Sequence, residues 1–513
     1  MFQLRGRTFR ILAGWPRGFK SKPGTIQFVS QAIPILEREA IGQDQSPDQR
    51  NMPPLVLINA VGLTSRWLAH APRLQALAQR GWLRSLREVV PAVTCTAQAT
   101  ILTGQTPQRH GIVANGWLWR DTGEVRFWQQ SNRLIEAEPL YVTARRQAAQ
   151  QGRAFRCAKL FWWFNQGAAV DWSVTPKPHY GADGNKVFGV YGTPDGLTDR
   201  LEQELGPFPF HTFWGPMAGL PCTEWIARCA AEVLQGERPD LTLVYLPHLD
   251  YDPQRFGLEG CDMPRLMGEL DRAAVPLLDK AEQLGARVWV VSEYGHCRVS
   301  RAVLPNRALR QAGLLTVRQG PFGETLDTFA SRAFAVCDHQ LAHVYVNDPH
   351  ALAKAQDVLA TLPGVARVVA GEERADEELA HPRSGELIAL SEADAWFAYP
   401  FWLDDRLAPD YARTVDIHRK PGYDPCELFF DPRLWWPRGR ALLRLIQKKL
   451  GFRTLFDVVP LAPELVRGSH GLRAVQPSDC PVLIGDGAAP AEGELAMTEV
   501  KGLAMQALGL EHR

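Results

Sequence analysis

Short apolar runs separated by amphipathic stretches recur along residues 55–300. Leu55-Val56-Leu57-Ile58 is a continuous apolar run, which is typical of a strand buried on both faces of a parallel sheet. The same pattern predicts strands at 241–246 and 287–291 and helices at 65–80 and 263–284. Because alternating strands and helices require crossover connections, we expect an α/β fold with a mostly parallel central sheet and helices on both faces.

A smaller unit is expected after this core. The pattern predicts a strand at 343–346, a helix at 349–362 and a strand at 365–369, which together indicate a small α+β insertion or cap. A late strand at 481–484 indicates that the chain then returns to the main sheet. The predicted organisation is a core at 52–340, the insertion at 341–395, the returning core at 396–485 and a C-terminal tail at 486–513.

The first 51 residues differ in character from the predicted core. They are basic, are interrupted by Pro16, Pro23 and Pro34, and end in a polar run. The basic start is not succeeded by an apolar segment with a small-residue cleavage site, so no signal peptide is predicted. We expect a weakly ordered extension, and Met52 is a candidate for the native start because it directly precedes the first strand.

Composition and charge narrow the function mainly by exclusion. Of 513 residues, 57 are Lys or Arg and 56 are Asp or Glu, so a net charge of +1 gives no basic footprint for nucleic acid. No segment approaches the roughly 18 apolar residues that span a bilayer. The nine cysteines form no C-x-x-C pair, which favours reduced thiols and a cytoplasmic location.

Polar residues follow several predicted strands, at the sheet edge where ligands bind in such folds. Thr94 opens a predicted helix, where free backbone N–H groups and the helix dipole favour an anion such as phosphate. The same surroundings lower the pKa of a hydroxyl, more so beside a metal ion. The alternative is an ordinary threonine N-cap.

The segment around Thr94 resembles a known nucleophile motif. Residues 91–94, the following helix, Leu102-Thr103-Gly104 and His110-Gly111-Ile112-Val113 are similar to the nucleophile segment of the alkaline phosphatase superfamily, in its type I phosphodiesterase/nucleotide pyrophosphatase branch. The resemblance extends more loosely over residues 55–484. It implies an alkaline-phosphatase-like core, a covalent intermediate on Thr94, and an Asn115 that holds the phosphoryl oxygens.

The resemblance also implies two divalent metal ions, which would clamp the attacking and leaving oxygens. Asp250 and His470 match ligands of one site. Three positions depart from the family: Asn59 stands where an Asp is expected, Gln254 where a His is expected, and Glu293-Tyr294 where an Asp-His pair is expected. We still expect Glu293 to bind metal together with Asp250 and His470, with Asn59 and Gln254 as weaker ligands. These ligands are mainly oxygens, which favours Mn²⁺ or Mg²⁺ over Zn²⁺, and a site with a single metal is an alternative.

Two other groups are candidates for lost ligands or for substrate contacts. His296 lies close to Glu293 in the sequence, and His339 and His343 form a compact group with Asp338 whose alternative role is to line a cleft. The segment 416–424 offers Asp416 and His418 as candidate ligands, and Arg419 and Lys420 as contacts to an anionic substrate. The alternative for this segment is a salt-bridged turn.

The sequence therefore predicts a metal-dependent hydrolase of a small-molecule phosphate ester. Two other functions remain open: a protein that binds a phosphorylated ligand without cleaving it, and a phosphoryl mutase or transferase of the same superfamily. The substrate, the preference for mono- or diesters and the oligomeric state are not specified by the residues.

Overall fold

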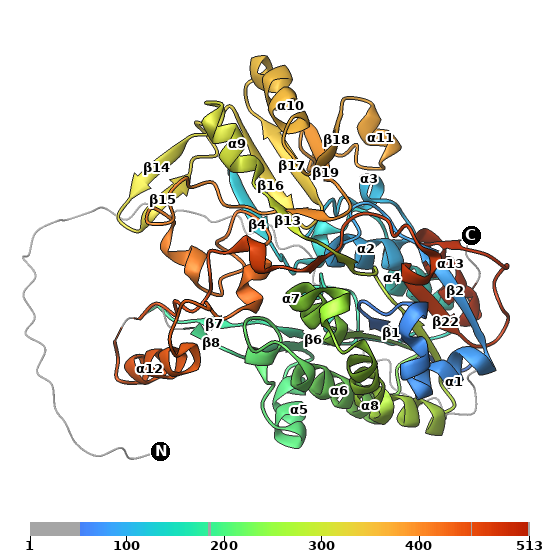
Figure 1. The fold of residues 1–513 in the computed structure, drawn as a ribbon. Coiled ribbons are helices and arrows are strands. Elements are labelled where there is room, and N and C mark those ends of the chain that lie inside the picture. The colour runs from blue at the N-terminus through green and yellow to red at the C-terminus, as the bar shows by residue number, and fades with distance from the viewer. Residues whose placement is uncertain (1–51, 183–185, 453, 511–513) are drawn as a thin grey trace, which may run out of the picture. The chain divides into compact units, whose positions relative to one another are not determined.

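The computed structural model describes residues 52–182, 186–452 and 454–510, so the predicted extension at 1–51 lies outside the described residues. A nine-stranded sheet forms the centre, in the order β23-β2-β22-β11-β1-β10-β5-β6-β9 (Figure 1). Its strands are β1 (Leu55–Ala60), β2 (Trp82–Arg87), β5 (Cys157–Leu160), β6 (Trp172–Pro176), β9 (Val190–Thr193), β10 (Leu241–Leu246), β11 (Arg287–Val291), β22 (Val482–Gly485) and β23 (Leu495–Ala496).

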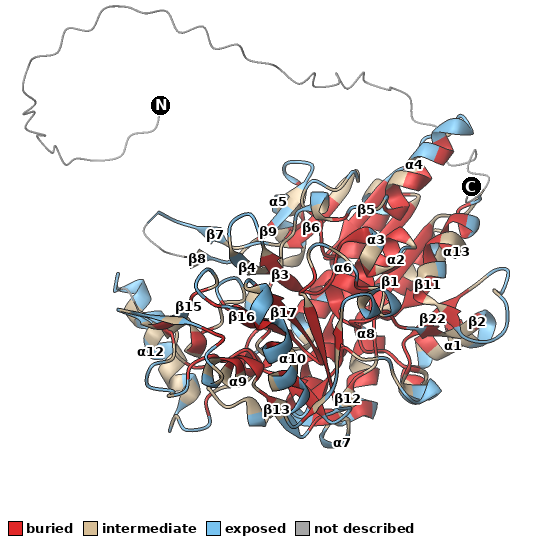
Figure 2. Cartoon of the chain, turned by 90° about the horizontal axis from the view of Figure 1, so that it is seen from above, coloured by how far each residue is buried: buried red, intermediate tan, exposed pale blue. Residues whose placement is uncertain are grey.

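The five strands β11, β1, β10, β5 and β6 run parallel to one another, whereas β22 and β9 run antiparallel to their neighbours. Every residue of β1 and β10 is buried, as a continuous apolar run requires (Figure 2). The prediction of a mostly parallel sheet is thereby confirmed, and β10 and β11 have the predicted bounds.

Helices cover both faces of this sheet (Figure 1). One group packs together as α1 (Pro72–Arg80), α5 (Leu197–Leu205), α6 (Leu220–Glu237) and α8 (Met263–Gln283), and the other as α2 (Thr94–Thr103), α4 (Leu140–Gln150) and α13 (Val500–Ala507). The single helix predicted at 65–80 is wrong. Ser65–His70 is a 3₁₀ helix and α1 starts only at Pro72. Proline disfavours helical geometry in the residue before it, and Ala71 is non-helical there, with φ −121° and ψ 80°.

A second, antiparallel sheet has the order β16-β17-β19-β18, and its strands are β16 (Ala333–Asp338), β17 (Leu341–Val346), β18 (Val365–Ala370) and β19 (Leu387–Ser391). The helix α10 (Leu352–Ala360) connects β17 to β18, and β19 lies between these two strands. The sheet includes β16, which precedes the expected start of the insertion at 341. The second sheet and α9 (Pro305–Gln311) share a hydrophobic core of their own.

Shorter elements complete the described chain: α3 (Pro107–His110), α7 (Tyr251–Gly260), α11 (Glu373–Asp376), α12 (Pro437–Lys449), β3 (Gly116–Trp119), β4 (Glu124–Phe127), β7 (His179–Tyr180), β8 (Lys186–Val187), β12 (Cys297–Arg298), β13 (Arg301–Val303), β14 (Val317–Gly320), β15 (Gly323–Leu326), β20 (Ala395–Phe397) and β21 (Gly468–Ser469). The segment expected as a tail supplies β23 and α13, because Leu495, Val500 and Ala504 are buried there. Within the described ranges, no helix combines the length and apolar character needed to cross a membrane.

Candidate active site

The carboxyl ends of β1, β10 and β11 form the floor of the candidate site. Asn59, near the end of β1, lies opposite Tyr245 of β10 on one side and Val291 of β11 on the other. Asp250 follows β10 in a 3₁₀ turn, and Glu293 follows β11. Because parallel strands end at one edge, residues distant in sequence meet here, as the polar strand ends predict.

Thr94 is the first residue of α2, and Val93 is the N-cap. The threonine therefore does not cap the helix with its side chain, and its hydroxyl is available for other contacts. It lines a cavity of about 1760 Å³ that also contains Asp250 and Tyr294. The N-terminus of α2 thus presents its hydroxyl and its positive dipole end to this cavity.

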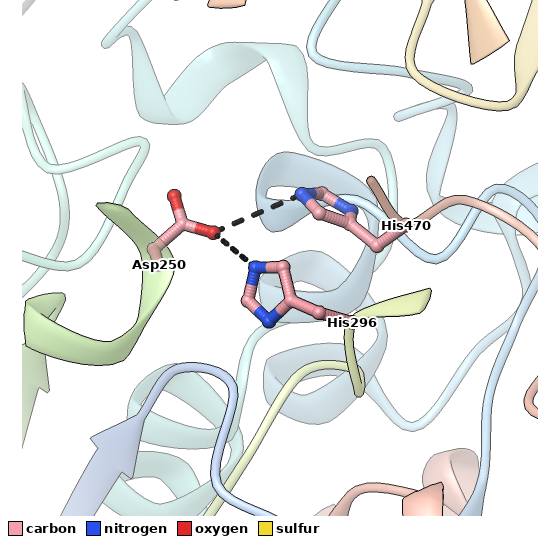
Figure 3. Close-up of side chains that lie close together, drawn as sticks. All are labelled: Asp250, His296 and His470. Atoms are coloured by element: carbon pink, nitrogen blue, oxygen red, sulfur yellow. Dashed lines mark hydrogen bonds and ion pairs between the residues drawn. The ribbon is translucent and has the colours of Figure 1, made fainter. Parts of the chain in front are cut away.

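Asp250, His296 and His470 form a three-residue cluster (Figure 3). One ligand atom from each lies within 4.8 Å of the others, and all three residues are buried. The ring of Tyr294 packs against both histidines. The His296 Nε2 is 3.1 Å and the His470 Nε2 3.8 Å from the Asp250 Oδ1. A carboxylate oxygen and two imidazole nitrogens at such distances can converge on one metal ion.

A short β-ladder brings the two histidines together although they are far apart in sequence. Cys297 of β12 pairs with Ser469 of β21, and each of these residues directly adjoins one of the histidines. Gly295 is required by the same packing, because a Cβ there would lie 1.9 Å from the backbone oxygen of Asp479.

The hydrogen bonds of His470 fix its protonation. Its Nδ1 lies 2.7 Å from the carbonyl oxygen of Ala92, and a carbonyl only accepts, so Nδ1 carries the proton. Burial, with His339 nearby, holds the His470 pKa well below its usual range, so the ring is neutral. Among the described residues no protein partner bonds its Nε2, which therefore offers a buried lone pair to the Asp250 side.

Tyr294 connects the cluster to Thr94. Its hydroxyl lies 3.0 Å from the Thr94 Oγ1 and donates to the Asp250 Oδ1 at 3.2 Å. Because a phenol has one proton, and Asp250 accepts it, Thr94 is the donor in the other bond. Burial and the nearby Asp250 carboxylate hold the Tyr294 pKa well above its usual range, so the phenol keeps this proton.

Glu293 belongs to a second group of polar side chains. Its Oε1 accepts hydrogen bonds from the Asn59 Nδ2 and, at 2.7 Å, from the Gln98 Nε2. Burial raises the Glu293 pKa to about 8, although these hydrogen bonds lower it. The Gln98 Oε1 in turn accepts a hydrogen bond from the backbone N–H of Trp163. The sequence did not indicate Gln98 as a site residue, because a glutamine inside an apolar helix gives no signal by itself.

Asn115 is held at the N-terminus of α2. Its Oδ1 accepts from the Cys95 N–H at 2.9 Å, while its backbone N–H and its Nδ2 donate to the Asp338 carboxyl at 2.7 and 3.1 Å. Asp338 is fully buried, which raises its pKa to about 7. The sequence indicated Asp338 only as part of a histidine group, and the structure shows that it orients Asn115.

The remaining candidates are not all in the cluster. The Gln254 Oε1 accepts from the Tyr423 hydroxyl at 2.6 Å, which occupies the oxygen that a metal would need. His339 has a positive φ of 57° and stacks between Tyr423 and His470. His343 bonds the Val113 oxygen with one ring nitrogen and the Gly385 N–H with the other, so both nitrogens have backbone partners.

The segment 416–424 contributes to the wall of the cavity. His418 and Arg419 line the cavity, and Asp416 accepts from Arg419 at 2.6 Å. Lys420 is buried in ion pairs with Asp424 and Glu427, both at 2.7 Å. The structure therefore does not place Lys420 for contact with a substrate, because its ammonium is already neutralised.

The ligand sets differ in how well they suit the two metal ions that the resemblance implies. Asp250, His296 and His470 suit one ion, and two imidazoles make Zn²⁺ as suitable as Mn²⁺, which removes the oxygen-based argument against zinc. Binding would require the His296 proton to reside on Nδ1. At the second position Tyr294 stands in place of the expected histidine, so only oxygens remain. The Glu293 Oε1 already accepts two hydrogen bonds, whereas the buried Glu293 Oε2 and Asn59 Oδ1 have no hydrogen-bond partner among the described residues.

Known proteins share this fold. The sequence profile of the type I phosphodiesterase / nucleotide pyrophosphatase family matches residues 55–424. No curated protein matches the chain significantly. Among solved structures, phosphonoacetate hydrolase from Sinorhizobium meliloti 1021, in complex with phosphonoformate, is similar with a TM-score of 0.55 and 15% identity, over 90% of this chain and 96% of that one.

Murine ectonucleotide pyrophosphatase/phosphodiesterase 5 is similar with a TM-score of 0.54 and 14% identity, over 89% of this chain and 95% of that one. It has also been solved as an inactive threonine-to-alanine variant in complex with AMP. At these identities the likeness shows the fold, which confirms the expected alkaline-phosphatase-like α/β core. Because the family profile covers most of the chain, the protein belongs to the type I phosphodiesterase/nucleotide pyrophosphatase family of phosphoester-cleaving enzymes.

Proposed function

We propose that the protein hydrolyses a small-molecule phosphate ester, with Thr94 as the nucleophile and one divalent metal ion bound by Asp250, His296 and His470. The observation that carries the proposal is the position of Thr94. Its hydroxyl opens α2 at the cavity and is linked through the Tyr294 hydroxyl to Asp250, one of the three candidate ligands.

The hydrogen-bond chain orients the nucleophile. Since Thr94 donates its proton toward Tyr294, the lone pairs of its oxygen are left for attack on phosphorus. As the Thr94 oxygen bonds to phosphorus, the bond from phosphorus to the leaving oxygen breaks, and the Thr94 proton passes through the Tyr294 hydroxyl to Asp250 and on to the leaving group. Water then attacks the phosphothreonine, the bond between the Thr94 oxygen and phosphorus breaks, and a proton of the water returns to the Thr94 oxygen. Tyr294 thus relays the proton of the nucleophile.

Two further groups would contact the phosphoryl oxygens. The N-terminus of α2 provides a positive dipole end, and Asp338 holds the Asn115 amide beside it. A bound divalent ion would supply Lewis-acid stabilisation of the developing negative charge. The large cavity beside Thr94, walled by Trp128, Trp163 and Trp214, would accommodate the leaving group.

The solved relatives support the assignment of the nucleophile. A threonine-to-alanine variant of murine ectonucleotide pyrophosphatase/phosphodiesterase 5 is inactive and was solved with AMP. We transfer this to Thr94 because residues 91–113 resemble the nucleophile segment of the family. Thr94 lies at the start of the helix that follows β2.

The test is the hydrolysis of bis(p-nitrophenyl) phosphate and p-nitrophenyl phosphate after loading with Zn²⁺ or Mn²⁺. Replacing Thr94→Ala should lower kcat by at least about a thousandfold, because the covalent route is lost. Thr94→Ser should retain part of the activity, since it keeps a hydroxyl.

The matched control is Thr96→Ala, which removes a buried hydroxyl from the same helical turn and should leave kcat nearly unchanged. Equal thermal unfolding temperatures for the two alanine variants would exclude a folding defect. Wild-type activity in Thr94→Ala would refute the nucleophile. Stoichiometric binding of a phosphorylated ligand without turnover would favour a binding protein instead.

A further inference from the structure

The helix α12 carries an apolar side that the described chain leaves exposed. No residue of α12 is buried. Leu442, Leu443 and Ile446 are 55%, 53% and 46% exposed, and Leu450, directly after the helix, is 70% exposed. Single exposed leucines are common on soluble proteins, but a contiguous group of them marks an interaction surface.

The exposed apolar residues share one face with a tryptophan. Gly439, Leu443, Ile446 and Leu450 follow one another at intervals of three or four residues, which places them on one side of a helix. The ring of Trp436 lies against Gly439, because a Cβ there would be 2.2 Å from two ring atoms. Trp436 therefore extends this face, and Trp435 beside it is 98% exposed.

The opposite side of α12 is attached to the body of the protein. Arg440 and Arg444 both bond the carboxylate of Asp457. The Lys448 ammonium donates to the backbone oxygen of Lys186 in β8, and Figure 1 shows α12 beside this strand. Ala441 and Leu445 line the cavity. The helix is thus fixed on its inner side and presents its apolar side outward.

The charges around this face determine which kind of partner it can bind. Residues 437–450 contain five Lys or Arg and neither Asp nor Glu. Arg438 and Lys449 are exposed. A second copy of the chain would bring two such basic helices together, and residues 1–51 are themselves basic, so both would be repelled. A binding partner for this face must offer apolar groups to its leucines and negative charge to its basic residues. An anionic membrane has both, because its interior is apolar and its headgroups are negatively charged.

We propose that α12, together with Trp435 and Trp436, docks the protein on an anionic membrane surface. The helix lies in the plane of the interface, its leucines and isoleucine enter the acyl boundary, and the tryptophans lie at the level of the headgroups. Arg438 and Lys449 pair with lipid phosphates. This attachment is peripheral and does not depend on the proposed catalysis.

The test is co-sedimentation of the full chain with vesicles of phosphatidylcholine and phosphatidylglycerol in equal parts. The wild type should bind these vesicles at least about tenfold more tightly than phosphatidylcholine alone. Leu442→Ser combined with Ile446→Ser should weaken binding by at least about tenfold, because the buried apolar area is lost. Arg438→Gln combined with Lys449→Gln should abolish the preference for the anionic lipid.

Matched controls change exposed residues elsewhere on the protein. Val475→Ser, at a site 84% exposed, and Arg228→Gln combined with Arg272→Gln should leave binding unchanged. Failure of the wild type to bind either vesicle would overturn the proposal, as would equal binding by the α12 variants and their controls. Sedimentation velocity that showed a dimer, converted to a monomer by Leu442→Ser with Ile446→Ser, would assign the face to a second copy instead.

Discussion

Two polar groups meet near Thr94, and they differ in the ligand atoms that they leave unbonded. In the first, called the open group below, Asp250, His296 and His470 converge, and a nitrogen lone pair of His470 has no protein partner among the described residues. In the second, called the glutamate group, the amides of Asn59 and Gln98 both bond the Glu293 Oε1, and the buried Glu293 Oε2 and Asn59 Oδ1 have no partner there. The first group therefore offers two imidazoles and a carboxylate to a metal ion, whereas the second offers only oxygens.

The largest expected effect comes from breaking the open group. Asp250→Asn should remove the bound metal and lower kcat by at least about a thousandfold, since several kcal/mol of charge stabilisation are lost. Metal content by mass spectrometry should fall from one ion per chain to less than one tenth. The control is His248→Gln, because His248 is a buried histidine two residues away that bonds Glu269 instead. Two ions per wild-type chain would contradict the difference between the two groups.

A smaller effect is expected from the residue that connects the open group to Thr94. Tyr294→Phe removes the hydroxyl between Thr94 and Asp250 while keeping the ring that stacks on His470 at 3.6 Å. We expect a loss in kcat of roughly a hundredfold with unchanged metal content, as for loss of a proton-transfer group. An unchanged kcat with a normal pH profile would show that Tyr294 only packs against the histidine.

The smallest effect on activity is expected from the glutamate group. Glu293 has its pKa raised to about 8 by burial, so the folded state holds this proton more tightly than the unfolded state. Its contribution to stability is full below pH 4.5 and is lost as the pH rises toward 8, with a slope of up to roughly 1.4 kcal/mol per pH unit.

Glu293→Gln should remove this slope and change kcat by less than about tenfold. Urea unfolding of the metal-free proteins across that pH range measures the difference, with Glu88→Gln as a control at another buried carboxyl whose pKa is raised to about 7. If Glu293→Gln instead abolished metal binding, Glu293 would belong to the open group.

The sequence predicted β1, β10, β11 and β22 well because these strands are almost fully buried and therefore nearly continuously apolar. It did not predict β2 or β9, most of whose residues are partly exposed. β10 and β11 have the predicted bounds, and β22 was expected within a residue. It predicted the helix at 65–80 poorly, since Pro72 interrupts an otherwise regular pattern. The small sheet was placed correctly in outline, but β16 precedes its expected start.

The candidate site was predictable only in part. Thr94, Asp250 and His470 lie in short sequence motifs that can be recognised from their neighbouring residues. The position of His296 in the cluster depends instead on the pairing of β12 with β21. The roles of Tyr294 and Asp338 depend on hydrogen bonds between residues about 200 positions apart or more. Such contacts leave no periodic signal in a single sequence.

The place of β22 in the sheet has a consequence for biosynthesis. This strand comes from residues 482–485, yet it lies between β11 and β2 and pairs with both. Until it has been synthesised, the edges of β11 and β2 remain unpaired, and exposed strand edges invite association with other chains. The central sheet therefore cannot be completed until most of the chain has been translated. Chaperones that shield exposed β-strand edges should determine the yield of this protein on expression.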